Sequence, residues 1–160
     1  MHSYFRVLYL HRISILVSIF IIVIDQLTKI LTSILLPLGT SWPNEGLLRL
    51  THARNTGAAF SLFQDQTMIL SLVSVVAVIF ILYIFRSIKN PPILLKFTFG
   101  LQIGGAIGNL IDRFRLGYVT DFIDFGWWPI FNIADSSIVI GITIMIIYLL
   151  FNKDNETDSE

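Results

Sequence analysis

The sequence predicts an all-α integral membrane protein with four transmembrane helices and a small β-rich connection between the first and second helices. Hydrophobic residues make up 54% of the 160 positions, charged residues only 14%, and the mean hydropathy is +0.75. A soluble domain is less apolar than this. Crossing the ~30 Å hydrocarbon core of a bilayer takes ~20 helical residues. Four apolar runs approach or reach that length, at 13–33, 67–85, 93–111 and 133–151.

The composition also limits domain organisation and function. We expect a single membrane-embedded domain over 1–160 that ends in a disordered acidic tail at 152–160. The net charge is zero and the eleven Lys and Arg residues are dispersed, so nucleic-acid binding is not expected. Cysteine is absent, which excludes thiol catalysis, iron–sulfur ligation and disulfides. Of three histidines only His52 lies near polar clusters, so we expect no metal and no cofactor.

The first run carries one pair of opposite charges. Asp25 and Lys29 lie at i and i+4, on one face of the expected helix. They could form a structural pair that neutralises itself, or they could serve a function, because charges inside a membrane are costly. Arg6 and Arg12 before the run would also suit a cleavable signal peptide. The run is too long for that and no small-x-small site follows it, so we expect a retained helix.

The connection at 37–66 contains more than turns. Alternation around Leu48 and Leu50 predicts short strands that lie against the membrane surface. The segment from Asn55 to Phe60 is too apolar for a solvated loop. We therefore expect this connection to be structured.

Glycines recur every four residues along the third run. Gly100, Gly104 and Gly108 are followed at the same spacing by Asp112. Small residues at this spacing let two helices approach closely within lipid, so we predict helix packing on this face. Asn109, Asp112 and Arg113 are expected to form one hydrogen-bonded cluster where the helix ends.

The polar connection at 115–130 leads into the fourth run. Asn132 is a good N-cap residue, and Asp135 then occupies the third helical position, where the helix dipole favours a negative charge. This local role would account for Asp135. It does not account for Asp121 in the connection.

Alternating helix directions bring every polar cluster to the same membrane face. Six Lys and Arg residues fall on the opposite side, against five on the cluster side, of which Lys29 and Arg113 belong to clusters. The six are Arg6, Arg12, Arg86, Lys89, Lys96 and Lys153. We therefore expect both termini in the cytoplasm and the polar clusters near the outer face.

Two neighbouring carboxylates can share one proton and perform acid–base chemistry on water without a metal. Asp121 and Asp135 could meet in this way, with Asp135 as the base and Asp121 as the acid, but the residues alone leave this as one pairing among several. A serine protease that pairs Ser136 or Ser137 with Lys29 is conceivable. A proton- or ion-coupled transporter is the alternative from another class, although the runs lack the ionisable residues of a relay across the membrane. A non-catalytic scaffold would explain the glycines but not the two aspartates.

Five motifs in order resemble those of the bacterial lipoprotein signal peptidase, type II. They span all four expected helices and both connections on the cluster side. The motifs are Asp25-Gln26-Leu27-Thr28-Lys29, the segment Asn55 to Phe60, the segment Gly104 to Arg113, Val119-Thr120-Asp121-Phe122-Ile123-Asp124, and Phe131-Asn132-Ile133-Ala134-Asp135-Ser136.

The resemblance implies a four-helix aspartic peptidase of the bacterial cytoplasmic membrane. Such an enzyme removes the signal peptide from diacylglyceryl-modified prolipoproteins just before the lipidated cysteine, and we expect it to act as a monomer among membrane lipids. The dyad carries over to Asp121 and Asp135. Residues that match the other motif positions are expected to support the dyad or line the cleft, and these are Asp25, Lys29, Asn55, Gly57, Asn109, Asp112, Arg113, Asn132 and Ala134. Asp124 is expected to be only a loop carboxylate.

Overall fold

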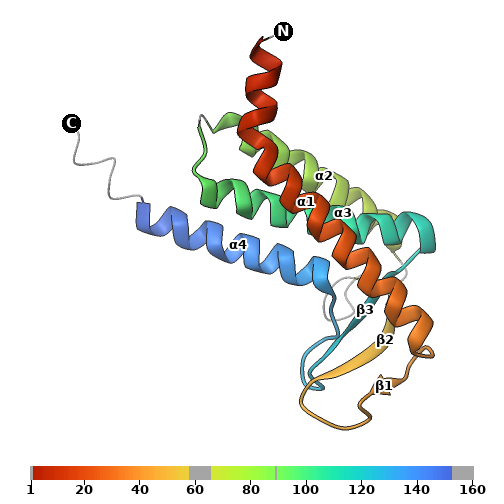
Figure 1. Cartoon of the computed structure of the whole chain (residues 1–160). Coiled ribbons are helices and arrows are strands. Elements are labelled where there is room, and N and C mark those ends of the chain that lie inside the picture. Colours follow the sequence, from red (N-terminus) through yellow and green to blue (C-terminus); the bar gives the residue numbers. More distant parts are fainter. Residues whose placement is uncertain (1, 58–65, 89, 153–160) are drawn as a thin grey trace.

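The computed structural model of the chain describes residues 2–57, 66–88 and 90–152, and confirms the four predicted helices (Figure 1). Each helix contains a stretch that is long and apolar enough to cross a membrane. The helices are α1 (His2–Leu35), α2 (Thr67–Ser87), α3 (Ile93–Leu116) and α4 (Ile133–Asn152). Lys89, residues 58–60 of the second motif, and the expected tail from Lys153 onward lie outside the described residues.

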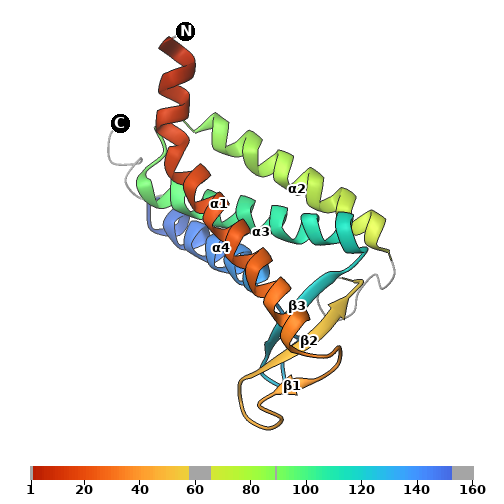
Figure 2. The same cartoon turned by 45° about the vertical axis from the view of Figure 1, so that its right-hand side comes forward.

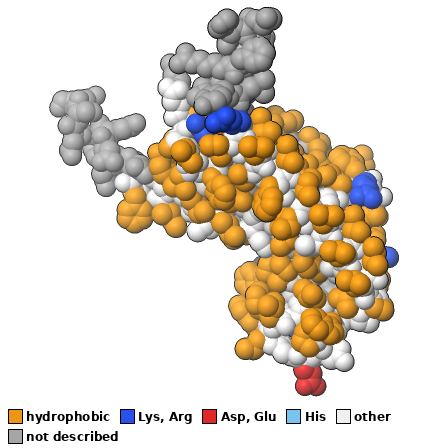
Figure 3. Space-filling view, in the orientation of Figure 1, with side chains coloured by type: hydrophobic (Ala, Val, Ile, Leu, Met, Phe, Trp, Pro, Cys, Tyr) orange, Lys and Arg blue, Asp and Glu red, His pale blue; other side chains and the backbone are white. Residues whose placement is uncertain are grey.

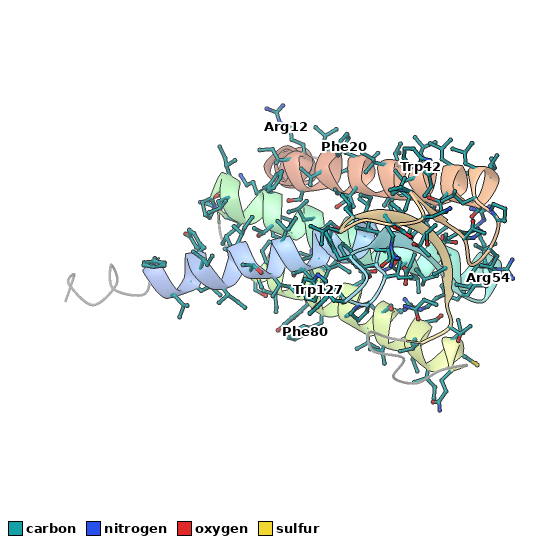
Figure 4. All side chains as sticks on the ribbon, turned by 90° about the horizontal axis from the view of Figure 1, so that it is seen from below. Arg12, Phe20, Trp42, Arg54, Phe80 and Trp127 are labelled. Atoms are coloured by element: carbon teal, nitrogen blue, oxygen red, sulfur yellow. The ribbon has the colours of Figure 1, made fainter. Side chains whose placement is uncertain are left out.

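The outer surface of the helices is apolar. Leu16 is 64% exposed, Ile34 73% and Phe80 60%, and hydrophobic side chains cover most of the face shown in Figure 3. Seen from below, Phe20 on α1 and Phe80 on α2 point away from the bundle (Figure 4). A water-soluble monomer rarely exposes so large an apolar surface. Lipid is the environment that suits it.

Helix α3 lies at the centre of the bundle and packs against the other three helices (Figure 2). On the α2 side, Phe85 and Phe99 place their ring centroids 4.5 Å apart within a small buried cluster. On the α1 side the predicted glycine stripe permits close contact. A Cβ atom added to Gly100 would lie 2.7 Å from Cβ of Val17, and one added to Gly104 would lie 2.9 Å from Cβ of Ile21. The packing role predicted for these glycines is confirmed.

A three-stranded antiparallel sheet lies at the end of the bundle opposite the start of α1 and the end of α4 (Figure 1). Its strand order is β1 (Ser41–Trp42), β2 (Arg49–Asn55), β3 (Val119–Asp124). The strands expected between the first two helices are present. The third strand comes from the connection at 115–130, where we expected none.

All four helices are longer than the runs predicted for them, α2 by two residues at its end. Helix α1 begins at His2, well before residue 13, and α4 extends to Asn152, which we had assigned to the tail. Helix α3 continues past residue 111 to Leu116, because its polar side chains find partners without ending the helix. It ends where Gly117 adopts φ 79° and donates its N–H to the carbonyl of Arg113.

Candidate active site

Asp121 and Asp135 line one cavity of about 780 Å³, which lies where the sheet meets α3 and α4. Asp121 is on β3, where it pairs with Ala53 of β2, and Asp135 is in the first turn of α4. The two carboxylates come from opposite ends of the connection between the third and fourth helices. The fold therefore brings the two predicted residues to a single cavity.

Two asparagine side chains hold the carboxylate of Asp121. Nδ2 of Asn132 donates to Oδ1 at 2.6 Å, and Nδ2 of Asn55 donates to Oδ2 at 2.9 Å. Asp121 is only 2% exposed. Burial, and then the nearby charge of Asp135, raise the pKa of Asp121 to about 7. Near neutral pH this carboxyl group is able to hold a proton and donate it.

Asp135 belongs to the predicted capping arrangement at the start of α4. Its backbone N–H donates to Oδ1 of Asn132 at 2.9 Å, and its Oδ2 accepts the backbone N–H of Asn132 at 3.3 Å. Its other oxygen, Oδ1, accepts Nδ2 of Asn109 at 2.7 Å. Asn132 therefore contacts both aspartates, and Asn109 contacts Asp135 from α3.

The orientation of all three asparagine amides follows from their other contacts. Oδ1 of Asn109 accepts from the ammonium of Lys29 at 2.9 Å, so its NH₂ group must face Asp135. Oδ1 of Asn132 accepts the N–H of Asp135, and Oδ1 of Asn55 accepts the N–H of Gly57 at 2.9 Å. Because each oxygen has a donor, each NH₂ group points to a carboxylate.

Lys29 and Asp25 form the predicted ion pair within α1, at 2.8 Å, but the pair does not stand alone. Lys29 also lies 3.3 Å from Asp112 of α3, and all three side chains are no more than 3% exposed. Gln26 donates to Asp112 at 3.0 Å and to the carbonyl of Gly108 at 3.2 Å. The charges join α1 to α3 and do more than neutralise each other within one helix.

The cluster expected for Asn109, Asp112 and Arg113 does not form as one unit. Asn109 and Asp112 are connected through Lys29, whereas Arg113 donates to Ser74 of α2 at 3.4 Å and lines the cavity. Asp112 and Arg113 are consecutive residues, so their side chains leave the helix about 100° apart and Arg113 points to another helix. Gly57 also lines the cavity, as expected.

Asp124 is more than a loop carboxylate. It is 5% exposed at the end of β3 and accepts hydrogen bonds from Arg49 at 2.8 Å, Thr51 at 2.6 Å and the N–H of Gly126 at 2.7 Å. Burial alone would raise its pKa, but these hydrogen bonds and the Arg49 charge keep the pKa of Asp124 below its usual value. Asp124 fastens β3 to β2 and anchors the loop that follows.

Sequence reasoning missed the apolar wall of the cavity. This wall is formed by the loop before α4 and by one face of α4, namely Trp128, Pro129, Ile130, Phe131, Ile138, Val139 and Ile140. The dense aromatic residues of 125–131 were the available signal. Gln26, inside a motif that we quoted, was also not recognised as a partner of Asp112.

Comparisons with known proteins agree with this architecture. The family model described as signal peptidase (SPase) II matches residues 17–151. The chain is 42% identical over 141 residues to the lipoprotein signal peptidase of Caldanaerobacter subterraneus subsp. tengcongensis, a match that covers 86% of this chain and 96% of that protein. It is 42% identical over 146 residues to the lipoprotein signal peptidase of Shouchella clausii, covering 90% and 97%.

Solved structures are similar too. A bacterial membrane enzyme determined by the in meso method at 2.3 Å resolution superposes with a TM-score of 0.85 at 34% identity, covering 92% of this chain and 93% of that one. A second, at 1.9 Å, gives a TM-score of 0.78 at 34% identity, with 86% and 92% covered.

Proposed function

The chain belongs to the signal peptidase II family, and on that premise we propose that it is an aspartic endopeptidase. Its substrates are diacylglyceryl-modified prolipoproteins, and it cleaves just before the lipidated cysteine. One observation carries the proposal: the carboxylates of Asp121 and Asp135 line the same cavity and are held by neutral donors, and none of the described residues forms an ion pair with either of them. Two such groups ionise together only at high cost, so they share a proton.

In the proposed reaction, Asp135 is the base and Asp121 is the acid. The N-terminus of α4 favours the anion at Asp135, which removes a proton from water as the water oxygen attacks the scissile carbonyl carbon. Asp121 gives its proton to the carbonyl oxygen. The C–N bond then breaks as the amine of the lipidated cysteine takes the proton from Asp135, and the product acid returns a proton to Asp121. The asparagines hold both carboxylates during these transfers.

The apolar wall of the cavity supports delivery of substrate from the bilayer. Val139 and Ile140 line the cavity, yet are 63% and 51% exposed on the surface of α4. The cavity therefore opens along a helix face that suits lipid. A substrate with a lipid anchor and an apolar signal helix can reach the aspartates laterally without leaving the membrane.

We place the enzyme in the bacterial inner membrane, with both termini in the cytoplasm and the site near the outer face. The start of α1 and the end of α4 lie at one end of the bundle, and the sheet and cavity at the other (Figure 1). Arg12, Arg86 and Lys96 belong to the first end. The positive-inside rule supports this orientation.

The described contacts argue against a serine–lysine mechanism. Lys29 is engaged by Asp25, Asp112 and Asn109. The hydroxyl of Ser136 donates to the carbonyl of Asn132, and that of Ser137 donates to the carbonyls of Leu101 and Ala134. An activated serine would instead donate to the lysine amine.

The proposed function is tested by cleavage of a purified diacylglyceryl prolipoprotein in detergent with a chelator present. We expect the wild type to cleave, and Asp121→Asn and Asp135→Asn to lose at least about 10³-fold in kcat, because each aspartate transfers protons in the transition state. A Ser136→Ala/Ser137→Ala variant is the control and should remain active. Full activity in either aspartate variant would contradict the dyad, and no cleavage by folded wild type would reopen the transporter alternative.

A further inference from the structure

The buried charges of α1 and α3 contact the backbone beside each aspartate of the dyad. Oδ2 of Asp112 accepts the N–H of Thr120 at 3.0 Å, and Thr120 immediately precedes Asp121. Oδ1 of Asp25 accepts the N–H of Ala134 at 2.9 Å, and Ala134 immediately precedes Asp135. In each case the backbone N–H of the residue before the aspartate is thus held by a carboxylate of the same ion-pair cluster.

A single ammonium group holds these two carboxylates. Nζ of Lys29 lies 2.8 Å from Asp25 and 3.3 Å from Asp112, and it donates to Asn109 at 2.9 Å. An ammonium has three N–H donors, and here each has one acceptor. The third acceptor, Asn109, donates in turn to Asp135.

These contacts hold the backbone segments that carry Asp121 and Asp135 in place against α1 and α3. A shift of the backbone at Thr120 or Ala134 would move the Cα atom of the aspartate that follows and displace its carboxylate in the cavity. Asn55 belongs to the sheet and Asn132 directly precedes α4, so their contacts with the aspartates do not connect these segments to α1. The dyad has one aspartate on a strand and the other on a helix, so something must fix the two elements relative to each other.

We infer that Lys29 is a positioning residue that sets the geometry of both aspartates at once, through Asp112 to β3 and through Asp25 to α4. This inference rests on the proposed function. A pair that served only to neutralise charge within α1 would need no contact with the backbone of β3 or α4. The burial of all three charges, at 3% exposure or less, is costly and fits a cluster retained for its geometry.

The decisive measurement is the split between kcat and KM in Lys29→Met, Asp25→Asn and Asp112→Asn. Misplacing reacting groups by about 1 Å costs roughly 100-fold. We therefore expect kcat per folded molecule to fall by about that factor in each variant, with KM changed less than about threefold. Lys96→Met, a lysine of α3 at the other end of the bundle, is the matched control and should retain wild-type kcat. Folded protein is quantified by gel filtration and thermal unfolding.

A double variant separates positioning from independent roles. If Asp25 and Asp112 act through one cluster, Asp25→Asn/Asp112→Asn should lose much less than the product of the two single losses. The two aspartate variants and their double variant also test the inference if Lys29→Met does not fold. Unchanged kcat in folded single variants, or strictly multiplicative losses, would overturn the inference while wild-type cleavage leaves the proposed function intact. Absence of cleavage by the wild type would instead overturn the proposed function, and the inference with it.

Discussion

Two groups of buried aspartates lie close together in this molecule, and they are held in different ways. Asp25 and Asp112 share the ammonium of Lys29 and make ion pairs at 2.8 and 3.3 Å. Within the part of the chain that the structure describes, the side-chain hydrogen bonds to Asp121 and Asp135 come from neutral amides of asparagines, from their side chains and from the backbone of Asn132. A carboxylate that is held by neutral donors can take and release a proton. The difference agrees with the proposed division between positioning residues and the proposed catalytic pair.

The largest effect should come from giving the dyad a cation of its own. In Asn55→Lys, an ammonium near Asp121 should lower the pKa of that group by about 1–3 units and keep it ionised at pH 7. We expect kcat to fall about 100-fold at pH 7 and to recover partly at lower pH. Steady-state cleavage across pH measures this. Asn55→Met is the control of similar length, and an equal loss in both variants, without recovery at low pH, would contradict the explanation.

A smaller effect should appear in the pH profile of the wild type. The pKa of Asp121 is raised to about 7 by burial and by the charge of Asp135. The proposed acid is active when protonated, so kcat/KM should fall about tenfold per pH unit above that value. The hydrogen bond from Asn55 lowers this pKa, so Asn55→Met should move the decline to higher pH. A profile that stays flat to pH 9 would exclude Asp121 as the acid.

The smallest effect should come from changing the glycines by which α3 packs against α1 beside Asp25. A Cβ added to Gly108 would lie 2.7 Å from Oδ2 of Asp25, whereas one added to Gly104 would meet α1 at Ser18 and Ile21. Both Gly108→Ala and Gly104→Ala should lower the free energy of unfolding by about 1–3 kcal/mol, because the helices must move apart. Only Gly108→Ala should also reduce kcat, by a few fold, since it displaces Asp25. Thermal unfolding measures the stability and cleavage assays measure kcat. Equal kcat values in Gly108→Ala and Gly104→Ala would contradict a specific role for the position of Asp25.

Local patterns in the sequence were enough to predict much of this structure. Four helices follow from apolar runs, the close contact of α1 with α3 follows from the glycine spacing, and the contact between Asn132 and Asp135 follows from a three-residue capping pattern. Each of these predictions uses a pattern of residues that lie close together in the sequence. The pairing of Asp121 with Asp135 was predicted from the family resemblance, because the residues alone left several pairings of carboxylates open.

The features that were missed depend on partners far along the chain. Strand β3 has five buried residues among its six, on both of its faces, so it lacks the alternation by which strands are detected. The Asp25–Lys29 spacing predicted a pair within one helix, and could not indicate that Asp112, Thr120 and Ala134 complete it. The direction of Arg113 toward Ser74 likewise required the position of α2.

The pairing of β2 with β3 also orders events during synthesis of the protein. Strand β2 emerges from the ribosome before α2 and α3 exist, and its partner β3 follows both of them. Asp135 comes later still, at the start of the last helix. Since domains assemble progressively as a chain is made, the nascent protein has no complete dyad while its first three helices enter the membrane. The two aspartates that we propose as the catalytic dyad are therefore complete only after the start of α4 has been made.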